Sequence, residues 1–327
     1  MKKHSFVLGV LVLGFLVIMS SVQVVSAQEF SGTVRIIVPY AAGGTSDIIS
    51  RLIAPHLQKA INANVIVENK PGASGNIGAD AVAHSKKDGH TLLFCDLVAL
   101  AAAPSLYGKK LTFSVEKDLV PVSLVMFAPY ILAVHPSVPV NSVEELVKYA
   151  KANPGKLAQG ISGIGNANHF TGLQLTKAWG VNWKFVPYKG GADAIRGVVT
   201  NESQVIINGA TATQSFVVQN QLKGLSVSGD KRLAALPNLP TWKELQLPVI
   251  ENGTWQGFLT TGGTPEKTVE RLNVEISKII ALPEVKKRIE DLGGEIKDGS
   301  AADFDKWMKR NIADLAKIVT EAGIKLD

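Results

Sequence analysis

The chain has 327 residues, of which 46% are hydrophobic and 19% charged, a composition typical of a globular protein with room for two domains. Its formal charge is +6, and its lysines are scattered rather than interleaved with aromatic residues, which argues against a nucleic-acid-binding protein. The single cysteine, Cys95, excludes an intrachain disulfide. A lone thiol at the end of an apolar strand is more often a core residue than a nucleophile.

The N-terminus has the features of an export signal. Lys2 and Lys3 precede a short apolar run, and Val25-Ser26-Ala27 forms a cleavage site before Gln28. An uncleaved anchor is the alternative, but the apolar run is short for a membrane span. No cysteine stands at the cleavage site, which argues against a lipid anchor. We therefore expect residues 1–27 to be a signal peptide and the mature protein, with 32 basic and 28 acidic residues, to reside in the periplasm.

The first half of the mature chain alternates apolar strands with helices. Strands are expected at 34–38, 65–68 and 91–95, and helices at 46–60 and 75–85. This alternation predicts a parallel sheet covered by helices.

A second alternating unit follows. After a strand at 130–134, a capping box from Ser142 to Glu145 opens a helix that ends at 153–155. Further strands are expected near 157–160, 184–188, 204–208 and 225–228, with helices at 166–179 and 191–200.

The last third of the chain has a strand at 255–259, a helix opened by Thr264-Pro265 and a final helix from about Ser300 to Gly323. Two similar α/β units and a helical C-terminus predict two lobes, each a mainly parallel sheet, joined by crossing strands. Residues 28–127 and 253–327 would form lobe 1, and residues 128–252 lobe 2.

Glycine-rich turns that follow a strand and open a helix occur four times, at residues 39–47, 69–78, 160–169 and 186–191. Such a turn leaves backbone N–H groups pointing at one spot, with the positive end of the helix dipole behind them. One turn alone is usually backbone geometry, but four across two lobes favour an anion site. Ligands of open parallel sheets bind beyond the carboxyl ends of the strands, so the cleft between the lobes is the expected site.

Several side chains near these turns are candidates for the site. Ser162 and Asn166 would add a hydroxyl and an amide, and Lys189 lies in a donor-rich turn. Tyr40 is either a pocket wall or a packing residue. Asp47 and Arg51, four apart, predict a surface ion pair in which Asp47 also bonds N–H groups at the start of its helix.

The enzymatic motifs are incomplete. Gly163-Ile164-Gly165 lacks the third glycine of a dinucleotide fingerprint, and the turns around Ser74 and Ser162 lack the final glycine of a nucleophile elbow. No Walker lysine follows a glycine loop, and the histidines show no metal-ligand spacing. We expect no cofactor, no metal and no catalytic residue, with His169 serving in packing or as a donor rather than as a base.

These motifs resemble one family over essentially the whole mature chain, the extracytoplasmic solute receptors of tripartite tricarboxylate transporters (the Bug or TctC family). The resemblance rests on residues 38–44 with Asp47 and Arg51, residues 69–78 and residues 88–92. Later matches are 163–165 with His169, 186–190, Pro240-Thr241 with Glu244, and 255–257 with 263–265.

The resemblance implies an α/β, two-lobed type II periplasmic binding fold that closes on a carboxylate and delivers it to a membrane permease. The carboxylate would be held mainly by amides, hydroxyls and waters. The lobe 1 residues carried over by position are Tyr40, Ala41, Gly43, Gly44, Thr45, Ala73 and Ser74, and the lobe 2 residues are Ser162, Gly165, Asn166 and Asn168.

Three positions depart from the family pattern. Asp96 follows Cys95 where small hydroxyl residues are common, and Gln204 and Asn208 stand where aspartate is frequent. Asp96 and Asn208 are therefore added to the expected ligand-binding residues, and Lys189 is added from its donor-rich turn. Asp96 could meet an amine or a hydroxyl of the ligand. The protein is expected to be a monomer. The alternatives are a sensor that signals to a membrane kinase and an exported α/β hydrolase.

Overall fold

The structure is a computed structural model that describes residues 30–247 and 253–322. In that part of the chain, no helix combines the length and the apolar character needed to cross a membrane. The expected signal peptide, the lobe boundary at residue 252 and the expected helix end at Gly323 lie outside the described residues.

The first α/β unit forms as expected. Strand β1 (Thr33–Val38) pairs in parallel with β2 (Asn64–Asn69) and with β3 (Thr91–Asp96). Helices α2 (Thr45–Ile61) and α3 (Asn76–Ala83) connect these strands. Cys95 is buried in β3 and belongs to the core, as expected.

Four short elements of this unit were not predicted. They are η1 (Ala73–Gly75), α4 (Leu97–Tyr107), η2 (Gly108–Lys110) and α5 (Val115–Asp118). Residues 97–103 of α4 are all apolar and buried, so this part of the helix has no polar face. A helix that is apolar all round lacks the 3.6-residue periodicity by which helices are recognised in a sequence.

The second α/β unit alternates in the same way. Its strands are β5 (Ala158–Ile161), β6 (Lys184–Pro187), β7 (Val205–Gly209) and β8 (Lys223–Val227), and its helices are α6 (Val143–Ala152), α7 (Ala167–Trp179), α8 (Gly191–Val199) and α9 (Ala210–Val218). The expected capping box is present at α6, where Ser142 Oγ accepts the Glu145 N–H at 3.1 Å. Helix α9 was not predicted.

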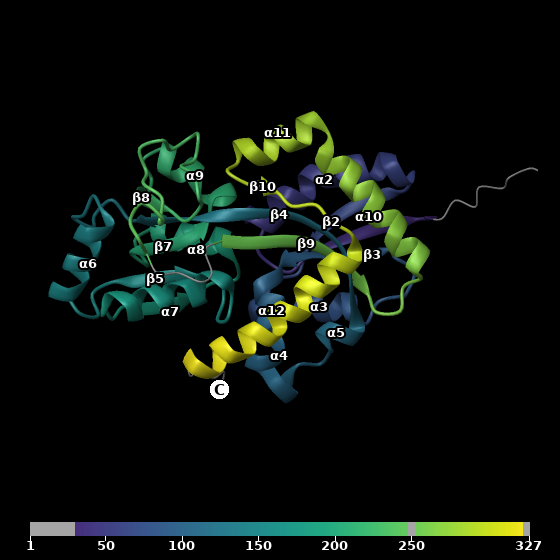
Figure 1. The fold of residues 1–327 in the computed structure, drawn as a ribbon, viewed down its shortest axis with the longest axis horizontal. Helices are drawn as coiled ribbons and strands as arrows, with labels where there is room; N and C mark the ends of the chain where they lie inside the picture. The colour runs from purple at the N-terminus through teal and green to yellow at the C-terminus, as the bar shows by residue number, and fades with distance from the viewer. Residues whose placement is uncertain (1–29, 248–252, 323–327) are drawn as a thin grey trace, which may run out of the picture.

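Two long strands connect the units. Strands β4 (Leu119–Val134) and β9 (Gly253–Thr261) pair antiparallel and run side by side between the two groups of elements (Figure 1). The first part of β4 pairs with β9 and its last residues pair with β7 and β8. Only residues 130–134 of β4 were predicted as strand. The rest contains Pro121 and Pro129, and proline within a segment argues against a central strand.

The sheet order is β2-β1-β3-β9-β4-β7-β5-β6, with β8 and β10 (Glu295–Ile296) also paired to β4. After β9, helices α10 (Glu266–Ala281), α11 (Pro283–Asp291) and α12 (Ala301–Ala322) return to the first unit. Buried Phe304, Met308 and Leu315 of α12 pack in the same core cluster as Leu97 of α4. We call the elements around β1–β3 lobe 1 and those around β5–β8 lobe 2; the exact residue boundaries stay predictions.

Candidate functional site

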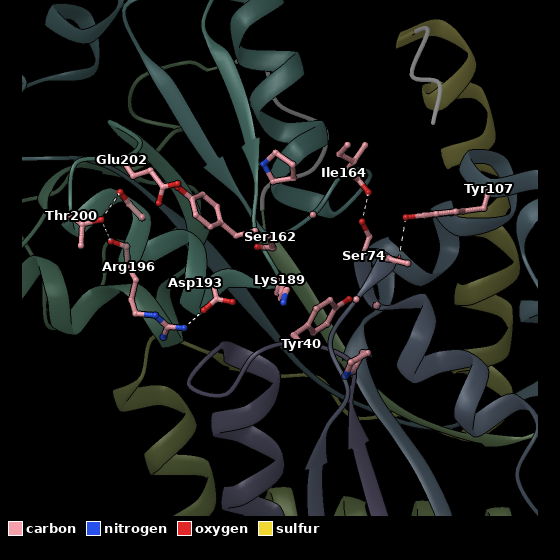
Figure 2. Close-up of a pocket in the computed structure, with 18 residues that line it drawn as sticks. Tyr40, Ser74, Tyr107, Ser162, Ile164, Lys189, Asp193, Arg196, Thr200 and Glu202 are labelled. Atoms are coloured by element: carbon pink, nitrogen blue, oxygen red, sulfur yellow. Dashed lines mark hydrogen bonds and ion pairs between the residues drawn. The ribbon is translucent and has the colours of Figure 1, made fainter. Parts of the chain in front are cut away.

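Two cavities are lined by residues of both lobes. The inner chamber, as we call the smaller one, has a volume of about 40 Å³. The outer cavity has a volume of about 770 Å³ and is shown in Figure 2. Tyr40 and Ser162 line both cavities. The inner chamber is lined by Tyr40, Gly44, Thr45, Ser46, Asp96, Tyr130, Ser162, Asn166, Asn168, Gly191, Asn208, Gly209, Thr254 and Gln256.

Five helices begin at the inner chamber. Residues at the N-termini of these helices line it. They are Gly44, Thr45 and Ser46 at α2, Asp96 at α4, Asn166 and Asn168 at α7, Gly191 at α8, and Gly209 at α9. The first-turn N–H groups of a helix have no acceptor within that helix, and its dipole is positive at this end. The starts of α2, α7, α8 and α9 therefore bring backbone donors and partial positive charge to the chamber, as an anion site requires. At α4, Asp96 itself accepts the N–H groups of Val98 and Ala99.

Two of the expected amide donors in lobe 1 lie outside both cavities. Ala41 and Gly43 line neither cavity. The Ala41 N–H donates to the Lys189 carbonyl oxygen at 3.0 Å, and the Gly43 N–H donates to Asp47 Oδ2 at 2.9 Å. Both donors are thus already used within the protein. Asp47 also forms the expected ion pair with Arg51, at 2.9 Å.

Three chamber residues that were not predicted form its floor with Asp96. Ser46 Oγ donates to Gln256 Oε1 at 2.7 Å, and Thr254 Oγ1 donates to Asp96 Oδ2 at 3.1 Å. Gln256 Nε2 donates to Thr254 Oγ1 at 2.6 Å and so links the two pairs. Thr254 and Gln256 are two residues apart on β9, so their side chains lie on the same face of the strand. Two polar residues at this spacing were the signal available in the sequence.

Asp96 is held as the N-cap of α4. Its Oδ1 accepts the N–H groups of Val98 at 2.9 Å and Ala99 at 3.4 Å. Burial raises the pKa of Asp96 from 3.8 to about 6, although the hydrogen bonds from Thr254 and the helix amides oppose this change. Burial also raises the pKa of the Tyr40 phenol, and the Asp96 charge adds to the effect, so Tyr40 keeps its proton.

The lobe 2 wall of the chamber is a set of amide and hydroxyl groups. Asn168 Nδ2 donates to Ser162 Oγ at 2.9 Å, and Asn208 Nδ2 donates to Thr213 Oγ1 at 3.1 Å. Asn166 Nδ2 donates to the Ser162 carbonyl oxygen at 3.0 Å. The expected residues Ser162, Asn166, Asn168 and Asn208 thus lie together on one wall.

Gly165, another expected ligand contact, lines neither cavity. Its N–H donates to His169 Nδ1 at 3.1 Å, and a β-carbon on Gly165 would collide with Leu106 of lobe 1. Burial lowers the pKa of His169 from 6.5 to about 4, so the imidazole is neutral at pH 7 and accepts this bond. His169 therefore orders the glycine turn that precedes α7.

The outer cavity holds the remaining expected residues, Ala73, Ser74 and Lys189. Its charged groups are Lys189, Arg196, Asp193 and Glu202, which Figure 2 shows on the lobe 2 side. Arg196 is paired with Asp193. The outer cavity thus carries charged side chains of both signs, in contrast to the inner chamber.

Hydrogen bonds cross the cleft from lobe to lobe. Ser74 Oγ donates to the Ile164 carbonyl oxygen at 2.8 Å, as the dashed line in Figure 2 shows. The bond from Ala41 to Lys189 also joins the lobes. Gly163 of lobe 2 lies close to the Ser74 side chain, because a β-carbon added to Gly163 would be 2.8 Å from Ser74 Oγ. The lobes are therefore in contact where these turns meet. We call this arrangement, in which the lobes touch, the closed form.

Removal of the Ser74 hydroxyl should favour opening of the cleft. In Ser74→Ala the Ile164 carbonyl loses its donor in the closed form, at a cost of about 1 kcal/mol. Calorimetry should show carboxylate affinity reduced by roughly fivefold. Ser105→Ala, an exposed change on α4, is the control and should leave affinity unchanged. Equal affinities of Ser74→Ala and wild type would show that this bond does not stabilise closure.

Two α/β lobes joined by crossing strands, with a chamber of helix N-termini between them, define a solute-binding protein of the periplasmic type. The solved structure of the periplasmic binding protein BugD is 30% identical, with a TM-score of 0.85 over 90% of this chain and 99% of that chain. The family model described as tripartite tricarboxylate transporter family receptor matches residues 49–324, and the chain belongs to this family.

Two further relatives agree with this assignment. R. palustris Rpa4515, solved with adipate, is 29% identical and has a TM-score of 0.85 over 90% of this chain and 98% of that chain. A UPF0065 protein from the tcbD-tcbE intergenic region of Pseudomonas sp. (strain P51) is 33% identical over 291 residues, covering 89% of this chain and 84% of the relative. The resemblance inferred from the motifs is thus confirmed.

Proposed function

We propose that the chain is a periplasmic receptor that binds a small carboxylate in the inner chamber and delivers it to a tripartite tricarboxylate-type permease. The observation that carries this proposal is the convergence of five helix N-termini on one chamber between the lobes. The adipate of the similar Rpa4515 supports a carboxylate as ligand. Cleavage after Ala27 would release the mature receptor into the periplasm.

The expected affinity follows from the donors around the chamber. A hydrogen bond to a charged group contributes about 1.5–3 kcal/mol. Three or four such bonds, less the cost of ordering ligand and lobes, correspond to a dissociation constant in the micromolar range, about −8 kcal/mol. The outer cavity would hold the rest of a longer acid.

Binding without chemical conversion agrees with the surroundings of the two cleft serines. The Ser74 hydroxyl donates to a backbone carbonyl, and Ser162 Oγ accepts from Asn168. His169 Nδ1, the nitrogen that could serve as a base in this turn, accepts the Gly165 N–H. A hydrolase would need a histidine directed at one of these hydroxyls.

A thermal-shift screen tests the proposal. Among mono-, di- and tricarboxylates, at least one acid should raise the melting temperature of the protein. At concentrations above its dissociation constant, the rise should grow with the logarithm of the concentration of the acid. Neutral sugars of similar size serve as controls and should have no effect. Stabilisation by sugars and by no acid would overturn the assignment of the ligand.

A further inference from the structure

The inner chamber contains an acidic acceptor in addition to its amide donors. Asp96 Oδ2 accepts one hydrogen bond, from Thr254, and a carboxylate oxygen can accept a second. No lysine, arginine or histidine is among the described residues that line the chamber. With a pKa of about 6, Asp96 is mainly ionised at pH 7.5. A negative charge thus lies beside the donors that would hold an anion.

A second acceptor lies on the opposite lobe. Asn166 is 2% exposed, and its amide is oriented by the bond from Nδ2 to the Ser162 carbonyl. Its Oδ1 is buried and accepts no hydrogen bond from the described residues. Buried polar atoms in proteins nearly always have a partner. Because Asn166 lines the chamber, a donor on a bound ligand is a candidate partner for this oxygen.

A bare carboxylate does not match this arrangement. It accepts hydrogen bonds from the helix amides, but it offers no donor to Asp96 or Asn166 and brings a like charge close to Asp96. The chamber volume of about 40 Å³ admits only a head group of a few atoms. Any donor that satisfies these acceptors must therefore be attached next to the carboxylate.

We propose that Asp96 and Asn166 make the receptor selective for carboxylates with an ammonium or hydroxyl group on the carbon next to the carboxyl group. The proposal rests on the proposed function, since it assumes that the carboxylate occupies the inner chamber. The helix amides bind the carboxylate, and the neighbouring donor bonds to Asp96 from lobe 1 and to Asn166 from lobe 2. An ammonium group, which also neutralises Asp96, is expected to bind most tightly.

Calorimetry at pH 7.5 with matched acids tests this selectivity. The four-carbon series is succinate, malate and aspartate, and the six-carbon series is adipate with its 2-hydroxy and 2-amino derivatives. In at least one series, wild type should bind a donor-bearing acid roughly tenfold or more tightly than the unsubstituted acid. A preference for the amino acid identifies an ion pair with Asp96, and a preference for the hydroxy acid identifies a neutral donor; either result supports the proposal.

Two variants remove the carboxylate and keep the helix cap. Asparagine and serine are both good N-cap residues, so Asp96→Asn and Asp96→Ser should preserve α4. Each should reduce the discrimination to less than about threefold. Asp303→Asn, the same change in the first turn of α12 and outside both cavities, should retain it.

The outcomes separate this inference from the proposed function. If wild type binds the unsubstituted acids as tightly as the substituted ones, or if both Asp96 variants retain the discrimination, the selectivity proposal is wrong and the receptor proposal stands. If wild type binds none of these acids and none in the wider thermal-shift screen, the receptor proposal fails as well.

Discussion

Gly191→Val is expected to lower carboxylate affinity by roughly 100-fold or more, to a level undetectable at micromolar concentrations. Gly191 lines the inner chamber at the first residue of α8. A β-carbon there would lie 2.7 Å from Asn208 Oδ1 and 3.1 Å from Asn208 Nδ2. The valine methyl groups would enter a chamber of only about 40 Å³ and displace the Asn208 amide.

The fold should tolerate this change, because Gly191 does not have a positive φ. Calorimetry with the acid that binds wild type best measures the affinity, and circular dichroism checks the fold. Gly299→Val is the matched control, since an added β-carbon there has no neighbour within 4 Å. Unchanged affinity in a folded Gly191→Val protein would place the ligand outside the inner chamber.

Asp96→Asn is expected to stabilise the ligand-free protein increasingly as the pH rises from 4 to 7. In the folded wild type the pKa of Asp96 is about 6, because the carboxyl group is buried. In the unfolded chain, where it is exposed, its pKa is 3.8. Between these values the folded state binds more protons than the unfolded state, so its stability falls as the pH rises. The difference of about two pKa units corresponds to a loss of at most about 3 kcal/mol in the free energy of unfolding of wild type. Asparagine does not ionise, so the variant avoids this loss.

Urea unfolding of wild type and Asp96→Asn at pH 4, 5, 6 and 7 measures this difference. The free energy of unfolding of the variant should rise relative to wild type across the series and level off above about pH 6. For the exposed Asp303, hydrogen bonds from Ser300 lower the pKa, so Asp303→Asn should not show this gain. A difference between Asp96→Asn and wild type that is independent of pH would contradict a buried, ionising carboxylate at this position.

The alternation of strands and helices was predictable because most elements are amphipathic or bounded by glycine and proline. Helix α4 was not, because its residues 97–103 are buried on every side. Most of β4 was missed for another reason: Pro121 and Pro129 lie in a strand that is central in the sheet. Tertiary burial, and not local propensity, determines both elements.

The glycine turns in the sequence indicated where a chamber would form. They did not indicate which backbone amides of each turn have partners elsewhere in the protein. Ala41 and Gly43 lie in the right turn, yet their N–H groups bond to Lys189 and Asp47. The acceptor for Ala41 comes from a residue 148 positions away in the sequence, so only the folded chain reveals it. Gly44 and Thr45, the next two residues, do line the chamber.

A crystal structure of the protein with its tightest-binding carboxylate tests the central claim most directly. We expect the carboxylate oxygens to lie about 3 Å from N–H groups at the start of α2 and of at least one lobe 2 helix, inside the inner chamber. A carboxylate bound instead to Lys189 or Arg196 in the outer cavity, with no contact to these helix N-termini, would contradict the account.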